Sequence, residues 1–366
     1  MPNVKFREFQ YTRKYTATGS LALDDVYLTD ACSMQVQLTQ VLQINTLAAQ
    51  MHRKMAYRVL QHELRLILSF LYSSPAGMLV ARGSDLLASA RQIGSFFTES
   101  VGLGMLTAAM RARCGWNGGH QDLDHFDVHP TPPSMTRFSR KGIRPDLMFS
   151  FKHQSPSSIA GEARGRARKQ PRLDHTYSEQ RGRLNEMLDW SGRYQSHPVT
   201  MAYTFIKGPH IAVDLFVPAS AEPLPYPDEP VGGTGPPRPR NRDPHRRTPD
   251  FDRLVDNIVT PDNESGSPDG AEALYETAPT SDRIQYLEGR EVRGDWVTAD
   301  LITQSSTRLF IGVLPDELRP STQAAANSLQ DPEDPISINL FGRVLLATAE
   351  GIRSPSWSDI SERLSQ

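Results

Sequence analysis

Two acidic residues on neighbouring predicted strands could hold a divalent cation. Asp146 opens a predicted strand over residues 147–152, and Glu162 lies within a predicted strand over residues 159–166. The turn between these strands permits a hairpin that brings both carboxylates together. A cation held by carboxylates beside a scissile phosphate lowers the pKa of a bound water and screens the phosphate charge. The spacing therefore offers the two carboxylates that metal-dependent phosphodiester hydrolysis would need at this hairpin.

Arg164 supplies the positive charge that such chemistry needs. It follows Glu162 by two residues, and the period of two along a strand puts both side chains on one face, about 7 Å apart. A guanidinium binds phosphate through two hydrogen bonds and can stabilise the charge that develops on phosphorus. Because it keeps its proton at ordinary pH, we expect Arg164 to stabilise charge.

The residues around these side chains resemble a known family. Pro145-Asp146 matches the first motif of the PD-(D/E)xK nucleases, the restriction-endonuclease-like superfamily, and the GEARGR run at 161–166 resembles their second motif. The resemblance covers residues 144–218 and departs from the family at Arg164, where the family has Lys. It implies an Mg²⁺- or Mn²⁺-dependent deoxyribonuclease. The implied catalytic residues are Asp146, Glu162 and Arg164, and the implied metal ligands are Asp146, Glu162 and the carbonyl of Ala163.

Helices beside the strands often add site residues in that superfamily. An acidic residue from a helix before the first strand is common, and either Glu63 or Glu99 could take that place. Some members carry Gln and Tyr on the helix after the second motif. Gln180 matches the first of these, but Leu184 stands where the Tyr would be.

Basic residues far outnumber acidic ones between residues 137 and 183. Such a density around the two carboxylates favours a polyanionic partner, with DNA expected first. The plainer alternative for this charge is a solvated basic loop. The plainer alternative for the two carboxylates is that Asp146 caps a turn and Glu162 pairs with a neighbouring arginine on the hairpin. The candidate nucleic-acid-binding residues are Lys141, Arg144, Arg166, Arg168, Lys169, Arg172 and Gln180.

The apolar pattern predicts the elements that must position this site. Residues 178–194 show helical periodicity, and residues 199–206 and 211–217 read as strands. We therefore expect an α/β fold, a mixed central sheet with flanking helices, with the restriction-endonuclease-like core at residues 131–218. Residues 1–130 are expected to be mostly helical, starting from Ser33, after a short strand or arm.

The C-terminal part is expected to have a different organisation. Residues 219–282 are rich in Pro, Gly and charge and predict a flexible linker. Residues 283–366 are expected to form a small α/β module. Its expected elements are strands over residues 295–303 and 307–314, then a strand and a short helix over residues 336–349.

Composition indicates the expected cellular compartment and the number of structural units. The chain has 366 residues and a net charge of −2, which suggests two or three units and gives no overall basic character. Two distant cysteines, Cys32 and Cys114, argue against a disulfide framework. The N-terminus lacks a signal-like apolar segment and no run of 18 apolar residues occurs, so a cytoplasmic protein without a membrane partner is expected.

Other constellations carry less weight. His and Asp residues crowd positions 114–129, but their spacing fits no zinc motif, so a polar loop is expected. No phosphate-binding Gly-rich loop or G-x-S-x-G elbow occurs. The leading hypothesis is a nuclease in restriction, phage defence, repair or recombination. The alternative is an inactive nuclease-fold module for nucleic-acid binding or assembly, with the N-terminal helices as a protein or homo-oligomer interface; a weaker third option is a structural protein.

Overall fold

The structure of the chain is a computed structural model. Lys141, the far end of the polar loop and most of the predicted linker lie outside the residues it describes. The described residues are 1–51, 55–126, 143–152, 156–173, 175–193, 197–219, 270–280, 285–298, 307–327, 334–351 and 355–365.

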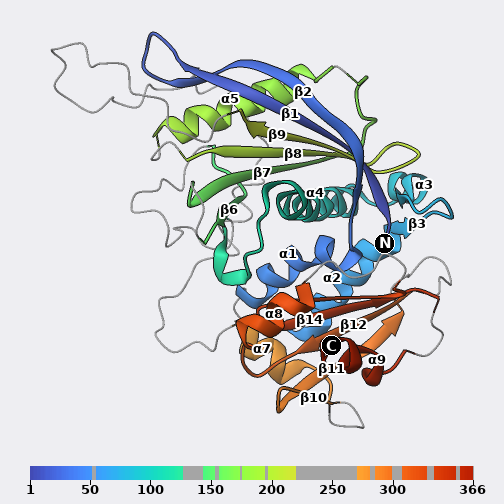
Figure 1. Ribbon diagram of the computed structural model, residues 1–366. Helices are drawn as coiled ribbons and strands as arrows, with labels where there is room; N and C mark the ends of the chain where they lie inside the picture. The colour runs from blue at the N-terminus through green and yellow to red at the C-terminus, as the bar shows by residue number, and fades with distance from the viewer. Residues whose placement is uncertain are drawn as a thin grey trace.

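A seven-stranded mixed sheet forms the larger half of the protein (Figure 1). Its strand order is β2-β1-β9-β8-β7-β6-β5, in which the pairs β1/β9 and β7/β8 are parallel and the others antiparallel. This confirms the predicted mixed α/β sheet. The strands are β1 (Asn3–Tyr15), β2 (Leu21–Gln35), β5 (Leu123–His125), β6 (Leu147–Ser150), β7 (Ser158–Arg166), β8 (Val199–Phe205) and β9 (Ala212–Pro218).

Helices cover both faces of this sheet. Alternate residues of β8 show why, because Met201 and Tyr203 pack with α5 (Ser178–Arg193), whereas Ala202 packs with α4 (Arg91–Cys114). The strand is buried along its whole length, as expected for a strand with a layer on each side. Among the described helices, only α4 is long and apolar enough to suit a membrane span, and most of it is buried inside the protein.

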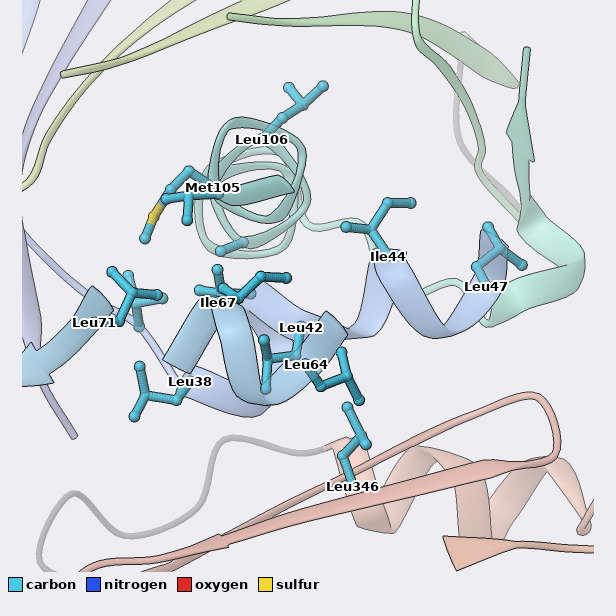
Figure 2. Packing of buried hydrophobic residues seen from close by; sticks show 14 of the residues in the cluster. Leu38, Leu42, Ile44, Leu47, Leu64, Ile67, Leu71, Met105, Leu106 and Leu346 are labelled. Atoms are coloured by element: carbon cyan, nitrogen blue, oxygen red, sulfur yellow. The ribbon is translucent and has the colours of Figure 1, made fainter. Parts of the chain in front are cut away.

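A second helical layer lies beyond α4. Figure 2 shows Leu42, Leu64 and Ile67 gathered beneath Met105 of α4, with Leu346 reaching them from the C-terminal sheet. Because α1 is buried along nearly its whole length, it offers little surface for the protein interface suggested for the N-terminal helices. The helices of this region are α1 (Leu38–Met51), α2 (Tyr57–Phe70) and α3 (Gly83–Ala88), and a small hairpin pairs β3 (Leu71–Ser73) with β4 (Leu79–Ala81).

The C-terminal part forms a second, antiparallel sheet with the order β10-β11-β12-β14-β13. Leu309 and Ile311 face the α1 side, whereas Phe310 faces the cluster that includes residues of α8 and α9. The protein is thus a stack of layers in which α1, α2 and α4 lie between two sheets (Figure 1). The elements are α7 (Gly270–Thr277), β10 (Gln285–Leu287), β11 (Arg290–Thr298), β12 (Arg308–Val313), α8 (Pro320–Asn327), β13 (Ile336–Phe341), β14 (Val344–Ala349) and α9 (Trp357–Ser365).

Several elements differ from the sequence prediction. The first 35 residues form two long strands, not a short strand or arm, because β1 pairs with β9 from the far end of the core. A short strand, β5, lies in the segment expected to be a loop, and α7 lies inside the predicted linker. These elements gain their order from tertiary packing, which local propensity does not report.

The prediction for residues 336–349 was wrong in its second half, where the structure has a strand in place of the expected helix. Gly342 turns the chain with a φ of 61° between β13 and β14. Gln50 of α1 holds this turn, since its amide nitrogen donates to the Phe341 carbonyl at 2.8 Å and its oxygen accepts from the Arg343 backbone N–H at 2.8 Å. A short apolar run such as residues 344–349 does not separate helix from strand by periodicity.

Candidate metal and phosphate site

The β6–β7 hairpin brings Asp146 next to the strand that carries Glu162. The Asp146 backbone N–H donates to the Gly161 carbonyl at 3.0 Å. Its side-chain Oδ2 accepts from the Ala163 backbone N–H at 2.7 Å. The Asp146 carboxylate therefore contacts the backbone directly after Glu162, and a charge at Asp146 acts on the same arginine, Arg183, that contacts Glu162.

Glu162 is the most unusual carboxylate of the site. It is fully buried on the sheet face that packs against α5. Its Oε1 accepts from Arg164 Nη2 at 2.6 Å and from Arg183 Nε at 2.7 Å. Its Oε2 is buried and has no hydrogen-bond partner among the described residues. A buried acceptor without a partner is costly, so this oxygen is a place where a cation would be stabilising.

Arg183 is the site residue that the sequence analysis missed. Its guanidinium also donates to Glu186 at 3.1 Å and to the Arg144 carbonyl at 3.4 Å. Burial alone would lower the pKa of Arg183, but Glu162 above all, then Glu186 and Asp146, raise it overall. Arg183 follows Gln180 by three residues, and residues three apart share a helix face. The predicted helix with Gln180 facing the site could therefore have pointed to Arg183 as well.

Gln180 itself lies inside the fold. It is fully buried, its Nε2 donates to Asp214 Oδ2 at 3.0 Å, and its Oε1 accepts from the Tyr177 backbone N–H at 2.7 Å. The second of these bonds closes the first turn of α5, as a capping glutamine does. Both ends of its amide are therefore bonded within the protein, which places Gln180 in the scaffold and not on a nucleic-acid-binding surface.

Gln180 belongs to a buried network around Asp214 and Arg7. Arg7 donates twice to the Asp214 carboxylate, at 2.8 and 2.6 Å, and Gln170 donates to it at 2.7 Å. Arg7 Nη1 also donates to the carbonyls of residues 171–173, at 3.3, 2.6 and 2.9 Å. The network joins β1 and β9 to the segment after β7. It therefore fixes the backbone that carries the predicted basic residue Arg172.

Arg166 and Arg168 share one acidic partner, Glu179. Arg166 donates to Glu179 Oε1 at 2.9 and 2.7 Å, and Arg168 Nη2 lies 3.0 Å from Oε2. Burial alone would raise the pKa of Glu179, but the two guanidiniums lower it overall. Arg168 also lies over the ring of Tyr177 at 4.0 Å, and Arg166 over Tyr203 at 5.7 Å. Both guanidiniums are thus held in place.

The other predicted residues occupy varied positions. Lys169 and Arg172 are exposed, and Arg144 is half-buried at the start of the hairpin. Glu99 is exposed on α4 and Glu63 is half-buried on α2. Both of these helices lie on the sheet face opposite α5, so neither glutamate lies on the face where Glu162 meets Arg183.

Gly165 of the GEARGR run lets α4 approach the sheet. A Cβ at Gly165 would lie 1.7 Å from the Thr98 carbonyl oxygen of α4, closer than any real contact. A Cβ at Gly102, on the same helix, would lie 2.8 Å from the Gly165 nitrogen. The two glycines therefore form a close helix–strand contact directly behind Arg164. This gives the glycine of the motif a packing role.

Among its described residues, the hairpin offers a cation no more than two acidic side chains. Within the described part of the chain, no three His, Cys, Asp or Glu side chains gather as a metal-binding group. In the polar loop, His120 pairs with Glu317 at 2.6 Å and His125 is buried in β5. A hard cation, which prefers carboxylate oxygens, would therefore have only the two predicted carboxylates, Asp146 and Glu162, as side-chain ligands in the described part of this hairpin.

Comparisons with protein-family models, with curated proteins and with solved structures found no match for this chain.

Proposed function

We propose that the chain is a metal-dependent nuclease with a restriction-endonuclease-like core, acting on DNA. The observation that carries this proposal is Glu162, a fully buried carboxylate whose Oε2 has no partner in the described residues and whose next residue, Ala163, donates its backbone N–H to the Asp146 carboxylate. Order along the chain supports it, since α5 and then β8 follow the β6–β7 hairpin, as the resemblance requires.

In this proposal Asp146 and Glu162 hold Mg²⁺ or Mn²⁺. When bound, the cation lowers the pKa of a water and screens the phosphate. The chain's own part is electrostatic: Arg164 and Arg183 stabilise the negative charge that develops on the phosphate. Arg164 cannot take a proton from water. Because the Glu162 side chain is fully buried, the charges around it act through a lower effective dielectric than they would in water.

A second candidate is an inactive nuclease-fold module that binds nucleic acid. One observation favours it: Arg164, at the position of the motif lysine, is itself ion-paired to Glu162 at 2.6 Å. A guanidinium on this carboxylate neutralises charge that a cation would otherwise neutralise. The two carboxylates and the two arginines, Arg164 and Arg183, then balance without a metal.

Cleavage assays separate the two candidates. We expect the wild type to cut plasmid or linear DNA with Mg²⁺ or Mn²⁺ and to lose all cutting in EDTA, with RNA as the comparison substrate. The Arg164→Lys variant is tested beside it. Cutting by Arg164→Lys alone would favour the inactive module, because one substitution would then have restored the site. No cutting by either protein with any of these substrates would contradict the nuclease proposal.

A further inference from the structure

Three arginines lie at alternate positions along the face of β7 that meets α5. Arg164 and Arg166 lie within the strand and Arg168 lies just beyond its end, and about a third of each side chain is exposed, at 31%, 34% and 34%. Two residues of a strand advance about 7 Å, which is close to the separation of successive phosphates along a nucleic-acid strand. The three are called the arginine ladder below.

One carboxylate occupies two members of the ladder. Glu179, whose side chain is 45% exposed, is the acid paired with both Arg166 and Arg168. The rings of Tyr203 and Tyr177 support the same two guanidiniums from below. The arginines are therefore held in position by groups other than Glu179, and they would stay aligned if the carboxylate were replaced by another anion.

We propose that Glu179 is a built-in competitor that a nucleic-acid strand displaces from the arginine ladder. The inference rests on the proposed function, since the strand would run along β7 from Glu162 toward Tyr177. An arginine fork binds a phosphate through two hydrogen bonds, as it binds a carboxylate. Because exposed ion pairs are weak, a strand that places phosphates on two arginines at once can displace the single carboxylate.

The test compares two variants with the same charge change on the same helix. Glu179→Gln frees the ladder, whereas Asp189→Asn removes an acid whose partner is Arg193, away from the ladder. Binding of a labelled single-stranded DNA is measured by fluorescence anisotropy in EDTA, so that no cleavage occurs. We expect Glu179→Gln to bind about three- to tenfold tighter than wild type, and Asp189→Asn to change binding less than twofold.

A double substitution of two arginines tests whether the gain at Glu179 acts through the arginine ladder. Arg166→Ala with Arg168→Ala is expected to weaken binding and to abolish the gain from Glu179→Gln in the combined variant. Equal affinities of Glu179→Gln and Asp189→Asn, or a gain that survives loss of both arginines, would overturn the inference, as would no measurable binding by any variant. These measurements need no metal. Binding with the expected pattern but without cleavage in Mg²⁺ would therefore contradict the nuclease proposal and still support the inference about the arginine ladder.

Discussion

The Asp214→Ala variant is expected to be about 3–5 kcal/mol less stable than the wild type, because it leaves a buried charge without its counter-ion. The Asp214 side chain is fully buried, and that of its partner Arg7 is 4% exposed. Removal of the carboxylate also leaves the donors of Gln170 and Gln180 without their acceptor. The change is read from the midpoint of urea unfolding and from the slope of that transition.

An exposed ion pair provides the control for this prediction. Lys14 and Asp24 lie 2.7 Å apart with side chains 62% and 46% exposed, and such pairs contribute about 0–1 kcal/mol. Asp24→Ala should therefore shift the midpoint only slightly. If Asp214→Ala were no more destabilising than Asp24→Ala, the Arg7–Asp214 network would not hold the segment after β7, and the position of Arg172 would need another cause.

The second large effect is expected at Glu162. Glu162→Gln should slow metal-dependent cleavage by at least about 100-fold, since even outer-shell partners of metal ligands contribute about 10–100-fold. The substitution keeps the size of the side chain but removes its charge, which leaves Arg164 and Arg183 without their shared negative partner. Initial rates on the best-cut DNA substrate measure the effect.

Glu186→Gln is the matched control, because Glu186 bonds the same arginine but is 49% exposed. It removes the same charge from the same guanidinium without touching the buried carboxylate. Its rate should stay within a few-fold of wild type. Equal loss in both variants would mean that Arg183, and not the Glu162 carboxylate, explains the effect.

The local elements of the core could be predicted because their signals are short-range. The expected elements over 159–166, 178–194, 199–206 and 211–217 correspond to β7, α5, β8 and β9 within about one residue at each end. Alternating or continuous apolar residues define such elements without reference to the rest of the chain. The Asp146–Glu162 hairpin follows from the same signals, because few residues separate its two strands in the sequence.

The rest could not be predicted because it depends on partners far apart in sequence. β1 becomes a central strand only through pairing with β9, about 200 residues later. Arg7 reads as a surface residue of that strand until Asp214 is placed opposite it. The pairing of Arg183 with Glu162 requires the packing of α5 on the sheet, which no local pattern specifies.

Binding of Mn²⁺ to the metal-free protein tests the central claim most directly, because it needs neither a substrate nor turnover. Titration calorimetry on the wild type, Glu162→Gln and Glu186→Gln would measure it. The proposed site predicts binding of Mn²⁺ by the wild type and by Glu186→Gln, and loss of that binding in Glu162→Gln. No binding by the wild type, or equal binding by all three proteins, would contradict a metal site at Asp146 and Glu162.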